Sequence, residues 1–514
     1  MLRDARNLWR LAGIGWTLAR HNALLFLLER LPIPPVALRL VRLVSRRRAP
    51  GRPGQRLAAA LQALGPSFIK LGQTLATRAD LLGDEVAADL SELQDKLPPF
   101  PFEQAKRTLE AEFGLPLGEL YAGFNPEPVA AASIAQVHFA LTPSGDEVAV
   151  KILRPGVEAA LARDLDLFAW GARWVESLQP GFRRLRPTAV IETFAASTRM
   201  EMDLRMEAAA ASELADNFRG EPGFRVPRVD WRRTGRRVLT LERVAGIASD
   251  ERGALIAAGF DPDVILERAA RVLFLQVFRD GFFHADMHPG NVFIDAEGDL
   301  VPVDFGIMGR LDQPTRRFLA EILVGFLTGD YRRVADVHFR AGYVPADQDK
   351  AAFMQACRAV GEPIRGLPLN EISVGRLLGQ LFRVTETFQM ETQTQLLLLQ
   401  KTMVVAEGVG RALNPSINMW QLAQPLIEQW IATNLGPQAE LRDLADELAD
   451  AARRLPALVV RAERVLRDIE EDRWSAPATR AGRVAADRLT SSRLAWALLL
   501  LLAGSLVAVL FIAA

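Results

Sequence analysis

The sequence is nearly free of cysteine and carries no excess charge of either sign. Cys357 is the only cysteine among 514 residues, which excludes an intramolecular disulfide framework and a cysteine-based zinc site. Lysine and arginine together number 62, and so do aspartate and glutamate. Because this balance creates no overall field that would attract a polyanion, we expect no nucleic-acid partner.

Long uncharged runs are rare as well, and the exception lies at the C-terminal end. Residues 494–514 contain no charged side chain, and about 20 apolar residues are enough to span a bilayer. Several arginines precede this run, and positive charge marks the cytoplasmic side of a membrane. The sequence therefore predicts a single C-terminal transmembrane helix, with the large N-terminal portion facing the cytoplasm. The N-terminal residues form either an amphipathic helix at the membrane surface or a helix that docks on the protein.

Secondary-structure patterns divide the rest of the chain. A basic stretch rich in proline and glycine, residues 44–56, predicts a linker, and a helical region broken by prolines follows it. Between residues 124 and 152, two β-type runs flank the turn sequence PSGD and predict a hairpin. From Ala248 onward the pattern is mainly helical, apart from residues 282–295 and the run LVPVDFG.

Residues 282–295, FFHADMHPGNVFID, concentrate polar groups between apolar runs, which is costly unless each group has a partner or a task. Asp286 and Asn291 lie in this stretch, and Asp304 follows in VPVDFG. Lys151 ends the earlier strand-like run VAVK. Phosphoryl transfer uses a lysine for phosphate oxygens, a carboxylate for the nucleophile, and carboxylate and amide oxygens for Mg²⁺. The order and spacing of these groups match the protein-kinase signature.

Three further motifs accompany this set. HADMHPGN stands in place of the ordinary kinase catalytic loop, AAASIAQVH stands where a glycine-rich loop is expected, and KLGQ precedes the kinase-like core. Together they resemble the UbiB family of atypical kinases. The resemblance implies an α+β, bilobal protein-kinase-like fold with a small β-sheet N-lobe, a helical C-lobe, an N-terminal helical extension and the C-terminal transmembrane helix. The expected divisions are a helical and linker region (1–56), a helical extension with the KxGQ motif (57–123), an N-lobe with inserted helices (124–247), a C-lobe (248–435), a helical tail (436–493) and the transmembrane helix (494–514).

The resemblance also implies roles for the chemical groups. Lys151 would contact the α- and β-phosphates of the nucleotide, with Glu207 as its ion-pair partner. Because the two lie far apart in the sequence, the alternative for Glu207 is an exposed helix residue. Asp286 would be the catalytic aspartate. Asn291 and Asp304 would be the Mg²⁺ ligands.

The alanine-rich stretch would bind the nucleotide where other kinases use glycine. Its residues are Ala130, Ala131, Ala132, Ser133, Ile134, Ala135 and Gln136. Alanine restricts the positive φ angles and the close backbone approach that glycine allows. This loop should therefore hold phosphates differently and prefer a different nucleotide state. Glu242 and Val244 resemble the hinge that receives the adenine.

The KLGQ motif would form a gate over the site. In the family it lies across the active site and meets an acidic pair, which Glu201 and Asp203 match here. Lys70 and Gln73 would then block a folded protein substrate and leave room for a small one.

The function that the resemblance implies is that of an atypical kinase or ATPase in the bacterial inner membrane, with its catalytic region facing the cytoplasm. It would bind ATP or ADP with Mg²⁺ and support ubiquinone (coenzyme Q) biosynthesis. Its partners would be the ring-modifying enzymes of that pathway and membrane lipids, including prenyl-phenol intermediates. The alternative is a nucleotide-gated scaffold or chaperone for prenyl-lipid precursors that transfers no phosphate to a product.

Overall fold

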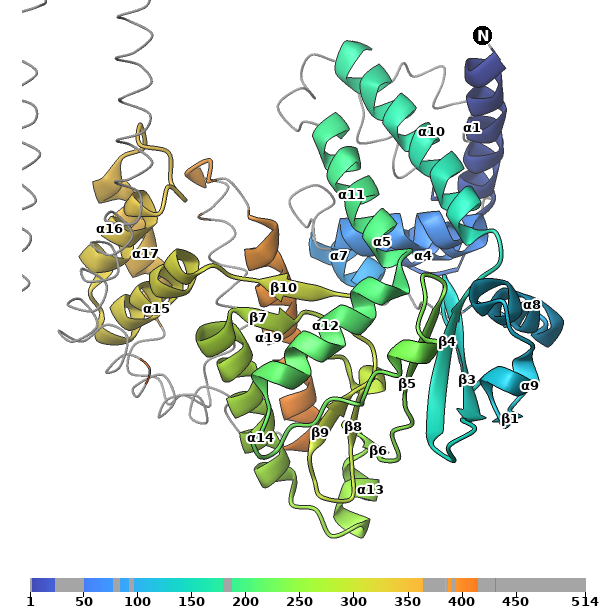
Figure 1. The fold of residues 1–514 in the computed structure, drawn as a ribbon. Helices are drawn as coiled ribbons and strands as arrows, with labels where there is room; N and C mark the ends of the chain where they lie inside the picture. The colour runs from blue at the N-terminus through green and yellow to red at the C-terminus, as the bar shows by residue number, and fades with distance from the viewer. Residues whose placement is uncertain are drawn as a thin grey trace, which may run out of the picture. The chain divides into compact units, whose positions relative to one another are not determined.

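The computed structural model describes most of the chain up to residue 414. The described residues are 2–23, 50–76, 84–91, 97–178, 187–363, 384, 387–390, 393–414 and 430. The chain forms two compact units, Met1–Ile431 and Ala432–Ala514, and the second lies outside the described residues. All the elements discussed below therefore belong to the first unit, and Figure 1 shows their described residues in colour.

A small antiparallel sheet forms the first lobe. Its strands are, in spatial order, β1 (Gly123–Phe124), β3 (Ala135–Leu141), β4 (Glu147–Leu153) and β5 (Val238–Glu242), with β2 (Ala130–Ala131) paired to β3. The hairpin predicted between residues 124 and 152 is the β3–β4 pair. Its turn contains Gly145 at a φ of +90°, a backbone conformation that glycine adopts at little cost.

Helices cover both faces of this sheet. They are α8 (Phe102–Phe113) and α9 (Leu117–Leu120) on one face and α12 (Leu204–Asn217) on the other. Successive side chains of a strand point to opposite faces. In β4, Val150 and Ile152 pack in the cluster of α8 and α9, whereas Leu153 packs in the cluster of α12. Lys151 therefore belongs to the α12 face of the sheet.

Two long helices separate β4 from α12 in the sequence. They are α10 (Val157–Leu178) and α11 (Pro187–Glu201), and they pack against each other. They also hold the N-terminal extension, because buried Ser67 donates a hydrogen bond from Oγ to Asp164 Oδ2 of α10 at 2.6 Å. The helices of the extension are α1 (Leu2–Arg20), α4 (Pro53–Leu64), α5 (Pro66–Ala76) and α7 (Asp84–Ser91).

Two details of the extension refine the sequence-based expectations. Helix α4 begins at Pro53, inside the stretch predicted as a linker, because proline suits the first turn of a helix. Of the two alternatives for the N-terminal residues, α1 shows docking: it packs on α4, and Arg6 pairs with Asp166 of α10 at 3.3 Å.

The second lobe is mainly helical around two short β-pairings. The strands β6 (Ile247–Ala248), β8 (Val292–Ile294) and β9 (Leu300–Pro302) form one sheet, and β7 (Phe282–His284) pairs with β10 (Met308–Arg310). The helices are α13 (Arg252–Ala257), α14 (Pro262–Phe274), α15 (Gln313–Thr328), α16 (Tyr331–Arg340), α17 (Lys350–Gly361) and α19 (Thr394–Leu413). Both β-pairings carry the residues of the candidate site at their ends.

The expected C-terminal transmembrane helix requires a correction. Among the residues that the structure describes, no helix is both long enough and apolar enough to cross a bilayer. Residues 494–514, on which the prediction was based, lie outside the described residues. The described residues therefore supply no bilayer-spanning element, and they give the expected transmembrane helix and single-span inner-membrane location no support.

Candidate functional site

Lys151 of β4 meets two carboxylates that come from different elements. Its Nζ lies 2.7 Å from Glu207 Oε1 and 3.0 Å from Glu207 Oε2, on α12. It also lies 3.3 Å from Asp304 Oδ2, on the segment between β9 and β10. The structure thus brings these three residues together, and Glu207 is buried rather than exposed.

Burial and mutual charge set the protonation of this group. Burial raises the pKa of Glu207 to about 7, although the Lys151 ammonium opposes the rise. Burial alone would lower the pKa of Lys151, but the charges of Asp304 and Glu207 outweigh it and raise that pKa above its usual value. Burial alone would raise the pKa of Asp304, but Lys151 and the Gly306 N–H hold it well below the usual range. Asp304 is therefore an anion whose side chain is 41% exposed, so it can receive a cation.

His284 fixes the backbone of the loop that carries Asp286. Its Nδ1 accepts a hydrogen bond from the Asp286 N–H at 3.1 Å, so its hydrogen resides on Nε2. That Nε2 donates to the Asp304 carbonyl oxygen at 2.5 Å. Burial lowers the pKa of His284, which keeps this tautomer neutral. One buried ring therefore fixes the backbone of Asp286 relative to that of Asp304, a role that sequence reasoning missed.

Asn291 ends a short 3₁₀ turn, Pro289–Asn291, that leads into β8. His288 caps the turn, since its Nδ1 accepts from the Gly290 N–H at 3.2 Å. The Asn291 carbonyl accepts from the Val303 N–H at 2.9 Å. Asn291 and Asp304 therefore lie at the same end of the β8–β9 pair.

This end of the hairpin fits a hard divalent cation. A carboxylate and an amide oxygen are ligands that suit Mg²⁺, which usually keeps waters and phosphate oxygens in its remaining positions. Within the described ranges, no group of three or more His, Cys, Asp or Glu side chains could hold a metal ion. Asn291 and Asp304 thus suit a metal ion whose remaining ligands include phosphate oxygens.

The structure adds a residue that the sequence did not suggest. Lys401 of α19 places Nζ 2.6 Å from Asp286 Oδ1. The signal was present, because Lys401 is the only charged residue between 394 and 406. Its partner lies 115 positions away, so no local pattern could connect the two.

The alanine-rich stretch folds as a closed turn between β2 and β3. The Ala132 N–H donates to the Ala135 carbonyl at 2.8 Å. The Ala132 carbonyl accepts from Arg154 Nη2 at 2.9 Å, and the Ile134 carbonyl accepts from the Arg154 N–H at 2.8 Å. These contacts leave the turn little freedom of its own.

The side chains of this stretch point mostly into the protein. Ser133 is fully buried, and Ile134 packs in the core of the α12 face. The Gln136 side chain accepts from the Phe100 N–H at 2.9 Å and contacts His138 at 2.8 Å. Any contact of residues 133–136 with a nucleotide would therefore use the backbone, whereas Ala130 is exposed and Ala131 and Ala132 are half-buried.

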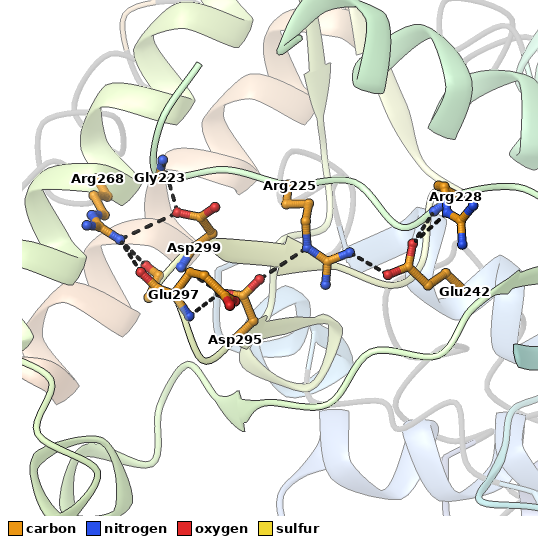
Figure 2. A network of polar contacts seen from close by, with 9 residues as sticks. Gly223, Arg225, Arg228, Glu242, Arg268, Asp295, Glu297 and Asp299 are labelled. Atoms are coloured by element: carbon orange, nitrogen blue, oxygen red, sulfur yellow. Dashed lines mark hydrogen bonds and ion pairs between the residues drawn. The ribbon is translucent and has the colours of Figure 1, made fainter. Parts of the chain in front are cut away.

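Glu242 ends β5 and belongs to a polar network that joins the two lobes (Figure 2). Its carboxylate accepts from Arg225 Nη1 at 2.8 Å and from the Arg228 N–H at 3.2 Å. Arg225 Nε also donates to buried Asp295, beyond β8, at 3.1 Å. The Glu242 side chain thus stabilises the connection between the lobes, and half-buried Val244 lies in the segment between β5 and β6.

The gate residues are brought together only in part. Lys70 Nζ on α5 lies 2.6 Å from Glu201 Oε2 at the end of α11, and both side chains are largely covered. Gln73 lies three residues further on the same helix, so it shares the face of Lys70. Asp203 instead caps α12 and pairs with Arg205 at 2.6 Å, which holds the pKa of Asp203 below its usual value.

Comparisons with known proteins agree with this architecture. Residues 92–338 match the ABC1 atypical kinase-like domain, and residues 357–418 match the UbiB helical domain. The chain is 42% identical to the probable protein kinase UbiB of Marinobacter nauticus over 451 residues, covering 86% of this chain and 82% of that protein. It is 41% identical to the probable protein kinase UbiB of Azotobacter vinelandii, covering 84% and 81% of the two chains.

A solved structure shares the fold. Rv3197 of Mycobacterium tuberculosis, determined in complex with erythromycin, is similar with a TM-score of 0.50 and 25% sequence identity. The similarity covers 76% of this chain and 97% of that one. The bilobal kinase-like fold expected from the motifs is therefore confirmed.

Proposed function

Because this chain belongs to the UbiB family of kinase-like proteins, we propose that it binds Mg²⁺–ATP at the described site and cleaves the γ-phosphate. The observation that carries the proposal is the convergence of Lys151, Glu207 and Asp304. A lysine that is held charged by two carboxylates is a preformed partner for nucleotide phosphates.

The residues divide the work by their chemistry. Lys151 would bind the α- and β-phosphates, with Glu207 fixing its position. Asp304 and Asn291 would hold Mg²⁺, which when bound would neutralise the negative charge between the phosphates. Asp286 would orient the nucleophile and accept its proton. His284 would keep the backbones of Asp286 and Asp304 in a fixed relative position.

The substrate and pathway are part of the same proposal. The family relationship supports a role in ubiquinone biosynthesis, with the ring-modifying enzymes or prenyl-phenol intermediates as partners. The closed alanine turn supports a difference between ATP and ADP binding, because its backbone is already engaged. The Lys70–Glu201 pair supports a gate that admits small substrates.

Phosphate release by the purified full-length protein tests the enzyme assignment. Asp286→Asn should lower the rate by orders of magnitude, since the amide cannot accept the nucleophile's proton. Glu213→Gln, at a half-buried position of α12 that pairs with Arg310, is the matched control and should retain the wild-type rate. Equal rates in wild type and Asp286→Asn would exclude the enzyme assignment and favour the nucleotide-gated scaffold.

Lipid analysis of a deletion strain tests the pathway. Loss of ubiquinone with accumulation of an early prenylated phenol is the expected result. Complementation with Asp286→Asn should fail if phosphoryl chemistry is required. An unchanged quinone pool in the deletion strain would exclude the pathway.

A further inference from the structure

Lys401 and Asp286 form an ion pair that is still open to a ligand. The Nζ–Oδ1 distance is 2.6 Å, and the side chains are 38% and 25% exposed. We propose that Lys401 is a further catalytic residue, which binds the phosphoryl group in transit beside Asp286. This inference rests on the proposed function, because it adds a group to the same site.

The catalytic loop has no fixed cation of its own. Its residues 284–291, HADMHPGN, include neither lysine nor arginine. The two histidines serve the backbone: His284 bonds through both ring nitrogens, and His288 accepts from the Gly290 N–H. In the part of the chain that the structure describes, the cation paired with Asp286 is Lys401.

Helix α19 holds Lys401 against the strand that carries the loop. Leu399 packs in one cluster with Phe283 and Ala285, which lie three residues and one residue before Asp286 (α19 is orange in Figure 1). The C-terminal end of the helix is fixed by Arg252, whose Nε donates to the Leu413 carbonyl at 2.7 Å. The backbone of Lys401 is therefore anchored, while its flexible four-carbon stem lets Nζ shift toward a ligand.

The chemistry of an ammonium group suits this task. It carries three N–H donors, and Asp286 uses one of them in the described contact. In the transfer step, the acceptor oxygen attacks the γ-phosphorus and Asp286 takes the acceptor's proton. The bond from phosphorus to the bridging oxygen breaks, and its electron pair leaves with ADP. Lys401 exchanges no proton; it donates hydrogen bonds to the phosphoryl oxygens, whose charge must be stabilised in the transition state.

Steady-state kinetics and binding on the full-length protein test this assignment. Lys401→Met should lower kcat about 100-fold, the usual effect of removing one donor from a transition-state charge. It should weaken Mg²⁺–ATP binding more than Mg²⁺–ADP binding, because ADP lacks the γ-phosphate. Lys401→Arg keeps the charge and should recover much of the rate. Arg411→Met removes a cation of the same helix, paired with Glu407, and should behave as wild type.

A double variant separates a shared role from a structural one. Asp286→Asn combined with Lys401→Met should be no slower than Asp286→Asn alone, because residues that act as a unit are not additive. A wild-type or higher kcat in Lys401→Met overturns the inference. A higher kcat would identify the ion pair as an inhibitory contact. Equal losses for ATP and ADP, or the same loss in Arg411→Met, also overturn it.

The outcome distinguishes this inference from the proposed function. If wild type binds no nucleotide, both fail together. If wild type hydrolyses ATP and Lys401→Met matches it, the inference about Lys401 fails alone.

Discussion

Glu207→Gln should make the ligand-free protein more stable at pH 8 while it lowers activity. The carboxyl is 7% exposed and shares one ammonium with Asp304. Burial raises the pKa of Glu207 from 4.5 to about 7, so the folded state binds a proton more readily than the unfolded chain does. The stability that this group contributes is thus fully present below pH 4.5 and is lost as pH rises through about 7.

The magnitude follows from the shift. Each pKa unit corresponds to about 1.4 kcal/mol, so the folded state loses roughly 3 kcal/mol across this range. Glutamine is neutral at every pH and keeps the shape of the protonated acid. The thermal midpoint of Glu207→Gln relative to wild type should therefore rise between pH 5 and pH 8 and then level off.

Thermal unfolding of both proteins without nucleotide, at half-unit pH intervals, measures this difference. Glu213→Gln removes a half-buried carboxylate, paired with Arg310, from the same helix and serves as the control. A midpoint difference that stays constant from pH 5 to pH 8 would refute the reasoning. Phosphate release at pH 7.5 should meanwhile fall, because Lys151 loses its positioning partner.

Three further predictions concern the turn, the lobe connection and a buried histidine. Ala132→Gly should change the ratio of ATP to ADP affinity, because the turn gains backbone freedom; titration with both nucleotides checks it, and an unchanged ratio contradicts it. Gly246→Ala should destabilise the fold by about 1–3 kcal/mol, measured by denaturant unfolding, because a Cβ would lie 2.6 Å from the Ile294 carbonyl oxygen. His138 is buried and its pKa is lowered, so the neutral ring contributes stability above pH 6.5 that is lost in acid. His138→Gln should therefore flatten the fall in thermal midpoint between pH 7 and pH 5, and an equally steep fall would count against this role.

The kinase-like fold was predictable because its motifs are local. Lys151 lies within an alternating strand, and Asp286, Asn291 and Asp304 keep a fixed spacing around two short strands. Such spacings report backbone geometry directly, so the loop that carries Asp286 and Asn291 could be placed from sequence. The pairing of Glu207 on α12 with Lys151 could be predicted only from the family resemblance, because α10 and α11 separate the two residues in the sequence.

The remaining contacts depend on packing that no local pattern encodes. Lys401 reaches Asp286 only because leucines of α19 settle beside β7. Arg225 joins Glu242 to Asp295 across three separate segments. Asp203 was expected beside Lys70, but its side chain instead caps α12 by accepting a hydrogen bond from the Arg205 N–H. The transmembrane prediction concerns residues 494–514, which lie outside the described residues, and no described helix is long and apolar enough to cross a bilayer.

The insertion of α10 and α11 has a consequence for how the molecule assembles. Lys151 and Glu207 are 56 positions apart, so their encounter closes a long stretch of chain. At equilibrium a longer loop is inexpensive, since each doubling of its length costs only about 0.6 kcal/mol. The long loop nevertheless slows folding, because contacts between positions far apart in the sequence form slowly. Lys151 should thus pair with Glu207 late in folding, after the inserted helices α10 and α11 have formed.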